Sequence, residues 1–258
     1  MLDINDHLRE VTEEEVAHYE EYGWAKLDGL VTREFAAQLL EVALQPRDDD
    51  AQLGVWEQMA NLPGIEPYRS FFFSERMGSN ASRLINRRKY TDDEVPLRYR
   101  LDHFIKRDPG PAVTHFHQDS SEHGSDRAGE LQFWMALDEV TPDMGAMRFL
   151  SGSHRAGPLG SVLREGEPDL LELYPKLVDH YPMSEPFHYQ PGDCTVHHGY
   201  MVHGSPPNTT DKSRLCYIFS YTPVDTRWPE GRTKNWGPLK RPLTDDVANP
   251  IAYPVPNA

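Results

Sequence analysis

Histidine and aspartate side chains lie in two separated stretches of the chain, at spacings typical of metal ligands. His117 and Asp119 are two positions apart in the segment THFHQD, residues 114–119. In a strand, side chains two positions apart project from the same face, so this pair would offer an imidazole nitrogen and a carboxylate to one ion. The distant His203 would complete a set of two histidines and one carboxylate. Such a set is typical of non-haem Fe(II), with three octahedral positions left open.

Neighbouring histidines are alternative ligands. His115 would share the strand face of His117, and His-x-His is also a metal spacing. We favour His117 because only it pairs with Asp119. His197 and His198 compete with His203, and we expect them to be packed or to lie behind the ligands. An isolated His-x-Asp is more often two surface polar residues of a strand, so other residues must support the interpretation.

Arg214 provides such support, because it follows His203 by eleven residues and opens the segment RLCYIFSY. Pairing of the two strands as antiparallel neighbours would bring the two side chains together. The planar guanidinium of arginine suits bidentate binding of a carboxylate. A buried arginine needs an anionic partner, and the local sequence offers none. A dicarboxylate cosubstrate would supply it.

These residues lie in a region whose apolar pattern has the two-residue period of strands. Residues 99–106 and 131–138 alternate, and residues 215–221 are rich in aromatic and β-branched side chains. Short strands between glycine and proline turns, such as Pro191-Gly192-Asp193, predict a sandwich or barrel. The expected fold class is therefore mainly β with flanking α, with the β core at about residues 98–222.

The residues before this core favour helices. Thr12 and Glu15 form the pattern of a capping box, and a second helix is expected after Thr32. We expect a helical elaboration over about 12–97. Within the longer interruption at 156–187, Pro168 would lie in the first turn of a short helix.

No linker divides the chain, so residues 1–258 are expected to form one domain. The Pro-rich tail at 237–258 would wrap the surface or be disordered. The acidic run at 48–50 would be a solvated loop.

Composition excludes several classes of protein. With 26 Lys and Arg against 41 Asp and Glu, the net charge is −15, which disfavours binding to nucleic acid or to anionic membranes. No apolar run has the length of a membrane span, and the N-terminus lacks the apolar region of a secretory signal. The only cysteines, Cys194 and Cys216, form no CxxC motif and suit a reducing cytosol. We expect a cytoplasmic monomer or homodimer.

In order along the chain, these features resemble the phytanoyl-CoA dioxygenase-like family of Fe(II)/2-oxoglutarate-dependent oxygenases. The similar pieces are His117-Gln-Asp119, the stretch LQFWMALDEVTPDMGAMRFLSGSH at 131–154, the turn at 191–193, His203-Gly-Ser205 and Arg214. Ser151 stands where the family signature usually has proline. The resemblance implies a double-stranded β-helix core of the jelly-roll or cupin-like kind, with N-terminal helices.

The resemblance also implies roles for individual residues. His117, Asp119 and His203 would bind Fe(II), and retention of Asp119 argues against halogenation. The remaining implied residues would bind the cosubstrate: Arg214 and Ser205 at the distal carboxylate of 2-oxoglutarate, Trp134 packed against the cosubstrate, and Thr114, with His103 as second choice, as a further polar contact.

The implied activity is O2-dependent oxidation of a C–H bond in a small molecule. Bacterial members of the family commonly tailor secondary metabolites, including antibiotics, by hydroxylation, oxidative cyclisation, epimerisation or desaturation. The aromatic side chains of the chain suit an apolar or glycosidic natural product as substrate. Residues 120–130 and 156–187 would form a lid. The alternatives are a cupin-like metal isomerase or hydrolase that does not use 2-oxoglutarate, and a non-catalytic sensor on the same barrel.

Overall fold

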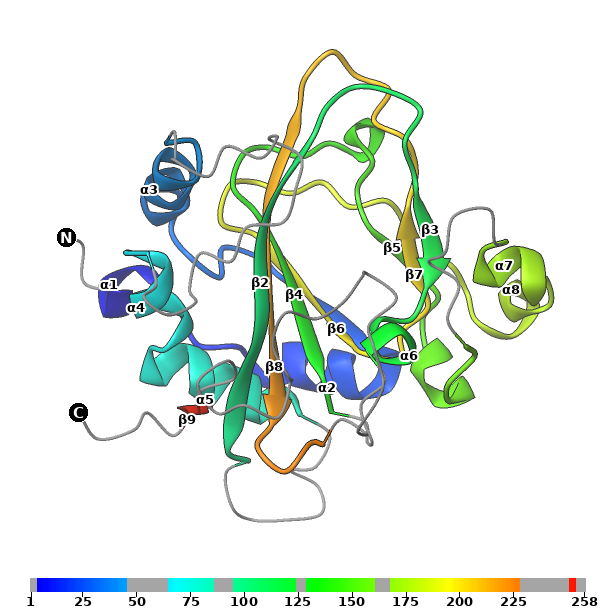
Figure 1. Ribbon diagram of the computed structural model, residues 1–258, viewed down its shortest axis with the longest axis horizontal. Helices are drawn as coiled ribbons and strands as arrows, with labels where there is room; N and C mark the ends of the chain where they lie inside the picture. Colours follow the sequence, from blue (N-terminus) through cyan, green and yellow to red (C-terminus); the bar gives the residue numbers. More distant parts are fainter. Residues whose placement is uncertain are drawn as a thin grey trace.

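Two antiparallel sheets face each other in the computed structural model, which describes residues 4–45, 65–85, 95–123, 129–160, 168–227 and 251–253 (Figure 1). The large sheet has the order β1 (Trp24–Leu27), β6 (Cys194–His198), β4 (Leu131–Ala136), β8 (Arg214–Pro223), β2 (Leu97–Arg107) and β9 (Ile251–Tyr253). The small sheet has the order β3 (Thr114–His117), β7 (His203–Ser205) and β5 (Arg148–Phe149). This arrangement confirms the predicted mainly-β jelly-roll class.

The alternation in the central strands separates two kinds of surface. In β4, Phe133 belongs to the apolar core beneath the helices, whereas Trp134 belongs to a second core between the sheets. Side chains of neighbouring strands that are opposite in register share a face of the sheet. Trp134 is opposite Thr195 of β6 and Ile218 of β8, so the even-numbered residues of β4 and β8 face the small sheet.

Helices cover the outer face of the large sheet: α1 (Ile4–His7), α2 (Glu13–Tyr22), α3 (Arg33–Ala43), α4 (Tyr68–Phe72) and α5 (Glu75–Leu84). In Figure 1, α1, α3, α4 and α5 lie on one side of this sheet and β3, β5 and β7 on the other. Aromatic rings form the contact, with the centroid of Phe71 5.3 Å from that of Phe219 and Phe72 stacked 4.4 Å from Tyr221. The helices thus give the sheet a rigid backing.

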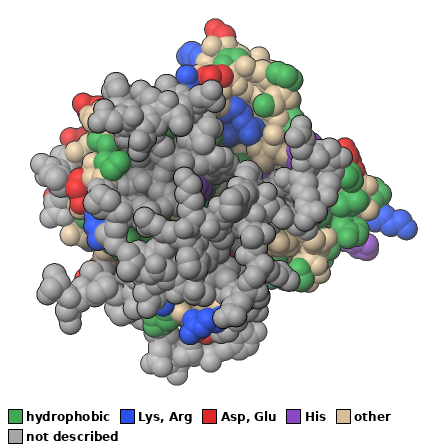
Figure 2. All heavy atoms as spheres, in the orientation of Figure 1, with side chains coloured by type: hydrophobic (Ala, Val, Ile, Leu, Met, Phe, Trp, Pro, Cys, Tyr) green, Lys and Arg blue, Asp and Glu red, His purple; other side chains and the backbone are tan. Residues whose placement is uncertain are grey.

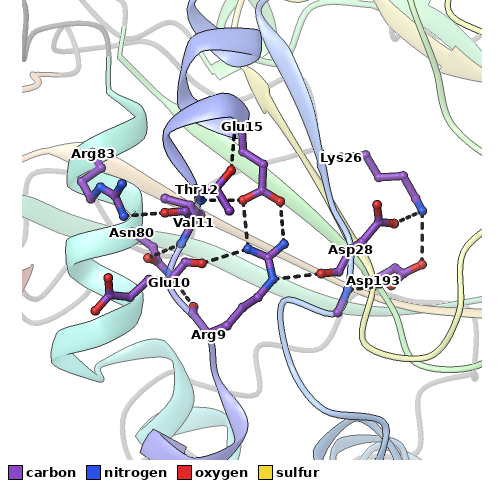
Figure 3. A network of polar contacts seen from close by, with 11 residues as sticks. Arg9, Glu10, Val11, Thr12, Glu15, Lys26, Asp28, Asn80, Arg83 and Asp193 are labelled. Carbon is purple, nitrogen blue, oxygen red and sulfur yellow. Dashed lines mark hydrogen bonds and ion pairs between the residues drawn. The ribbon is translucent and has the colours of Figure 1, made fainter.

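Helix starts follow the local sequence. The Thr12 hydroxyl accepts from the backbone N–H of Glu15, whose carboxylate accepts from the N–H of Thr12, so the capping box is present. Arg9 binds the same carboxylate at 2.5 and 2.9 Å (Figure 3). Thr32 caps α3 in the expected way, through the N–H of Phe35.

The remaining described elements lie outside the small sheet or connect the strands. They are α6 (Asp119–His123), α7 (Leu170–Leu173), α8 (Leu177–His180) and two short 3-10 turns, Pro142–Met144 and Ser153–Ala156. Figure 2 shows hydrophobic side chains on the protrusion that α7 and α8 form, where Leu173, Tyr174 and Val178 are exposed. Among the described helices, none has both the length and the apolar content needed to cross a bilayer.

Two predictions about the strands near the candidate ligands were wrong. β3 ends at His117, and Asp119 begins α6 instead of continuing the strand. β7 and β8 belong to different sheets, so Arg214 does not reach the interior by pairing with the strand of His203. His203 and Arg214 both face the interior of the barrel, His203 from the small sheet and Arg214 from the large sheet.

Smaller differences occur at the edges of the fold. Pro168 precedes the N-cap, Asp169, of α7 instead of lying in its first turn. In the tail, Ile251–Tyr253 pairs with β2 as an edge strand. The rest of 237–258, the acidic run at 48–50 and residues 124–128 and 161–167 of the expected lid lie outside the described residues.

Candidate metal centre and its arginine pair

The possible ligand atoms of His117, Asp119 and His203 all lie within 4.8 Å of one another. Nε2 of His117 is 3.3 Å from Oδ1 of Asp119, and Nε2 of His203 is 3.7 Å from Oδ2. His115, the alternative ligand, is exposed and is not part of this group. Two imidazole nitrogens and one carboxylate therefore converge at the interior of the barrel.

Backbone pairing and a strand-to-helix turn bring the three side chains together. His117 and His203 are direct partners in the pairing of β3 with β7. The chain turns into α6 straight after β3, which brings the carboxylate of Asp119 back toward both rings. His117 and Asp119 thus come together because the chain turns between them, and not because alternate residues of one strand share a face.

Hydrogen bonds to the backbone set the tautomer of each candidate ligand. Nδ1 of His117 is 2.7 Å from the carbonyl oxygen of His115, and Nδ1 of His203 is 3.0 Å from that of Met201. A ring that donates from Nδ1 keeps its Nε2 lone pair for a cation. Both Nε2 atoms lie on the Asp119 side, so the donor set fits a divalent metal.

The electrostatics favour the deprotonated forms that a metal needs. Burial, reinforced by the nearby His197, lowers the pKa of His203 well below its ordinary value. Burial alone would raise the pKa of Asp119, but the surrounding imidazoles of His203, His117 and His197 hold it well below the ordinary value. A carboxylate beside imidazoles with free ring nitrogens is a suitable ligand set for Fe(II).

A third histidine supports the group from the large sheet. Nε2 of His197 is 3.0 Å from Oδ2 of Asp119, and its ring centroid is 4.2 Å from that of His203. His197 therefore contacts two of the candidate ligands, Asp119 and His203, without being a member of the candidate group itself, as expected. His198 points elsewhere, because its Nδ1 accepts from the backbone N–H of Tyr200 and its ring lies 5.5 Å from that of His154.

Arg214 is buried at the start of β8, with 2% of its surface exposed. It donates to the carbonyl oxygen of Gly145, and its guanidinium carbon lies 5.3 Å from the ring centroid of Trp134. Within the described residues no carboxylate pairs with it, and its Nε has no partner. A buried guanidinium in this situation needs an anion.

Arg107, which the sequence reasoning missed, lies directly opposite Arg214 in the pairing of β2 with β8. It donates to the hydroxyl of Ser205 at 2.7 Å and to that of Thr114 at 2.5 Å. Burial and the neighbouring charge of Arg214 lower the pKa of Arg107 to about 10. No carboxylate pairs with Arg107 in the described part of the chain, so two guanidinium groups share a site without an anion.

The other expected cosubstrate residues surround this arginine pair. Ser205 is opposite Thr114 in the β3–β7 pairing, and the two hydroxyls are 3.1 Å apart. Trp134 is buried between Arg214 and Tyr189. His103 lies on the same face of β2 as Arg107, opposite Ile218. A signal for Arg107 was present, because it continues the alternation of the odd-numbered residues 99–105, but its register with Arg214 could not be read from the sequence.

Comparison with known proteins agrees with this fold and site. The family model for phytanoyl-CoA dioxygenase (PhyH) matches residues 10–216, well over half of the chain. The chain therefore belongs to the phytanoyl-CoA dioxygenase family. A curated protein of Oryza sativa subsp. japonica named phytanoyl-CoA dioxygenase 1 is 30% identical over 128 residues, which are 49% of this chain and 44% of that protein. The chain thus spans less than half the length of this relative.

Solved structures share the architecture at lower identity. The epimerase SnoN, solved with Fe3+, alpha-ketoglutarate and a nogalamycin compound, is 23% identical with a TM-score of 0.70, covering 93% of this chain and 98% of that one. The carbocyclase SnoK from nogalamycin biosynthesis is 20% identical with a TM-score of 0.67, covering 93% and 96%. EvdO2 from Micromonospora carbonacea var. aurantiaca is 19% identical with a TM-score of 0.64, covering 92% and 98%. At these identities the likeness establishes the fold.

Proposed function

We propose that the protein is an Fe(II)- and 2-oxoglutarate-dependent dioxygenase that oxidises a C–H bond of a small molecule. The observation that carries this proposal is the pairing of two sites inside one barrel. His117, Asp119 and His203 offer a divalent-metal site, and Arg107 and Arg214 form a cationic site with no carboxylate partner among the described residues. A cosubstrate with a metal-chelating end and a distal carboxylate satisfies both.

The residues of the chain have separate tasks in this proposal. His117, Asp119 and His203 hold Fe(II), which would bind the keto acid of 2-oxoglutarate and activate O2 when loaded. Arg214 and Arg107 neutralise the distal carboxylate of 2-oxoglutarate. Ser205 and Thr114 hold the orientation of the Arg107 guanidinium by accepting hydrogen bonds from its two terminal nitrogens. Trp134 covers the face of Arg214 and excludes water from the charged contact.

The type of oxidation is proposed from the reactions of structurally similar proteins, and not from residues of this site. The named relatives SnoN and SnoK belong to nogalamycin biosynthesis as an epimerase and a carbocyclase. We extend this to a tailoring step on a natural product, by hydroxylation or by oxidative cyclisation, epimerisation or desaturation. An apolar or glycosidic substrate, a cytoplasmic location and a monomer or homodimer stay predictions.

The test is anaerobic titration of the Fe(II)-loaded protein with 2-oxoglutarate, followed by visible absorption, with succinate release in air as a second readout. The wild type should give a weak charge-transfer band. Arg214→Ala and Arg107→Ala should raise the 2-oxoglutarate requirement at least a hundredfold, because losing one partner of a buried charged pair costs about 3–5 kcal/mol. The exposed Arg33, which binds Gln190, provides the control Arg33→Ala.

Absence of the band and of succinate in the wild type would instead favour a cupin-like metal isomerase or hydrolase. An unchanged requirement in both arginine variants would remove the cationic site from the proposal. A tenfold larger rise of the 2-oxoglutarate requirement in Arg214→Ala than in Arg107→Ala would show that Arg214 makes the stronger contact with the cosubstrate. That result remains consistent with the proposal.

A further inference from the structure

A row of polar side chains crosses the inner face of the large sheet next to the candidate metal centre. Gln132 of β4 is opposite His197 of β6 on one side and opposite Ser220 of β8 on the other. Residues opposite each other share a face of the sheet. Because His197 contacts Asp119, all three side chains lie on the face that looks toward the metal centre.

Each member of the row has a polar atom without a partner among the described residues. These atoms are Oε1 of Gln132, Oγ of Ser220 and Nδ1 of His197. At most 3% of the surface of each residue is exposed. Buried polar atoms are nearly always hydrogen-bonded in native proteins, and leaving one unpaired is costly. Three such atoms in adjacent register positions beside the candidate metal centre therefore point to a ligand-binding site.

The remaining contacts decide the hydrogen-bonding character of these atoms. Gln132 donates from Nε2 to Oε1 of Glu130 at 3.1 Å, which fixes the amide so that its vacant atom is the carbonyl oxygen. His197 donates from Nε2 to Asp119, and a ring that carries its proton on Nε2 offers Nδ1 as an acceptor. The Ser220 hydroxyl can donate or accept. The row thus presents acceptors, and its ligand must present hydrogen-bond donors.

The charge around the row is balanced. Glu130, which binds Gln132, also accepts from the hydroxyl of Ser120 and lies 3.7 Å from Nε of Arg100. An anionic ligand would face the carboxylate of Glu130 and two acceptors, and an apolar ligand would leave the acceptors buried without partners. A neutral ligand that carries hydroxyl groups satisfies them.

The row lies away from the arginine pair along the strands. Arg214 begins β8 and Ser220 is six positions further on, about 20 Å at the rise of a strand. In β4, Trp134 packs on Arg214 and Gln132 is the next side chain on the same face. Gln132 and Ser220 therefore lie toward the opposite end of the inner face from Arg214, the residue proposed to bind the cosubstrate.

We propose that Gln132, His197 and Ser220 form a substrate subsite that binds hydroxyl groups of a neutral polyhydroxylated molecule, such as a sugar or cyclitol ring. This inference rests on the proposed function and narrows its substrate class. The subsite would hold the hydroxylated substrate beside the metal centre. His197 would bind a substrate hydroxyl through Nδ1 while its Nε2 donates to Asp119.

The first experiment measures thermal unfolding without substrate. Ser220→Ala removes a buried hydroxyl that has no partner in the described part of the chain, so the melting temperature should rise by about 2–4 °C. Ser82 is the matched control, since it is equally buried but accepts from the backbone N–H of Val95 at 3.0 Å. Ser82→Ala should lower the melting temperature by a similar amount. A fall in Ser220→Ala as large as in Ser82→Ala would overturn the proposal.

The second experiment titrates the anaerobic Fe(II)–2-oxoglutarate complex with methyl hexopyranosides and cyclitols, and with their fully O-methylated counterparts. At least one hydroxylated probe should perturb the charge-transfer band, and its dissociation constant should rise tenfold or more in Ser220→Ala and Gln132→Leu. The O-methylated probes cannot donate and should have no effect.

The outcomes separate the two proposals. Failure of the band to form contradicts the proposed function, and the melting temperatures still decide whether the row is unpaired. A band that forms normally but responds to no hydroxylated probe, or responds equally to O-methylated ones, leaves the dioxygenase intact and overturns the hydroxyl subsite.

Discussion

His117 and His203 each use one ring nitrogen to hold their orientation and keep the other for a cation. The contacts of Nδ1 with backbone carbonyl oxygens come from residues two positions earlier, His115 and Met201. Each ring is thus oriented by the backbone just before it and does not depend on a distant side chain. The carboxylate of Asp119 depends on His197, a residue of the other sheet. The geometry of the donor set therefore couples the two sheets through one oxygen atom.

Replacement of His117 by alanine should abolish stoichiometric binding of Fe(II) or Co(II), because it removes one of three protein ligands. His115→Ala is the matched control: it is two positions away on the same strand, but its side chain is exposed. Metal content after desalting and the visible spectrum of Co(II) measure the effect. Full metal content in His117→Ala, with loss in His115→Ala, would reverse the assignment of the ligand.

His198 should make the metal-free protein sensitive to acid. Burial, with the nearby His154 and His197, lowers the pKa of His198 to about 3, whereas an unfolded histidine titrates near 6.5. Between these values the unfolded chain binds a proton that the folded state does not, so stability falls as pH decreases from about 6.5 to about 3. At pH 5 the loss is about 2 kcal/mol.

Urea unfolding of the chelator-treated protein at pH 7.5 and pH 5 measures this loss. His198→Gln should reduce the difference between the two pH values by about 2 kcal/mol, since it removes the titrating group. His188→Gln provides the control, because the His188 side chain is about half exposed and contacts Glu139 at the surface. Equal pH dependence in the wild type and His198→Gln would refute the argument.

At the scale of elements, the pairing of β3 with β7 sets the separation of His117 and His203, the two candidate histidine ligands. Gly204 lies between His203 and Ser205, and a Cβ there would lie 2.7 Å from the backbone oxygen of Thr114 and 3.1 Å from the ring of Phe116. Backbone cannot move away without separating the two strands. The glycine thus permits the close approach on which the His117–His203 pairing depends.

Gly204→Ala should therefore weaken metal binding and destabilise the protein by about 1–3 kcal/mol, the usual cost of forcing extra atoms into a packed interior. Co(II) titration and urea unfolding measure the two effects. Gly29→Asn is the control, because Gly29 has φ +55° with nothing within 4 Å, and asparagine tolerates that conformation. Wild-type Co(II) affinity in Gly204→Ala would show that the strand pairing does not set the ligand geometry.

The sequence predicts features that depend on local chemistry. The capping box at Thr12 and the N-cap at Thr32 form because their hydrogen bonds lie within one turn. Alternation identifies β4 as a strand although all of its residues are buried, because successive side chains enter two different cores on opposite faces of the sheet. The convergence of the His117 segment with His203 follows from their pairing. Their roles as ligands stay predictions.

Features that depend on the assignment of strands to sheets could not be predicted in this way. The turn from β3 into α6 is not marked by proline or glycine, so Asp119 looked like a strand residue. The separation of β7 from β8 into two sheets is a property of the whole fold. Arg107 was missed for the same reason, because its importance appears only when its register with Arg214 is known.

At the scale of the whole molecule, the metal and the cosubstrate would connect the two sheets. His117 and His203 belong to the small sheet, whereas Arg107 and Arg214 belong to the large sheet. Helices cover the outer face of the large sheet, so its interior face is the one available to a small molecule. A ligand that contacts both sheets binds the folded state and not the unfolded chain, and it stabilises the fold by mass action.

Co(II) and 2-oxoglutarate should therefore raise the melting temperature in two steps. Each ligand at about a hundred times its dissociation constant adds about 2.7 kcal/mol, which corresponds to roughly 5–10 °C for a chain of this size. Scanning calorimetry of the protein alone, with Co(II), and with both ligands measures the steps. His203→Ala should lose both, because 2-oxoglutarate needs the metal, whereas Arg214→Ala should keep the Co(II) step and lose most of the second. A second step of wild-type size in Arg214→Ala would mean that Arg214 does not hold the cosubstrate, and the large sheet would then have to contribute through Arg107 or through the contact of His197 with Asp119.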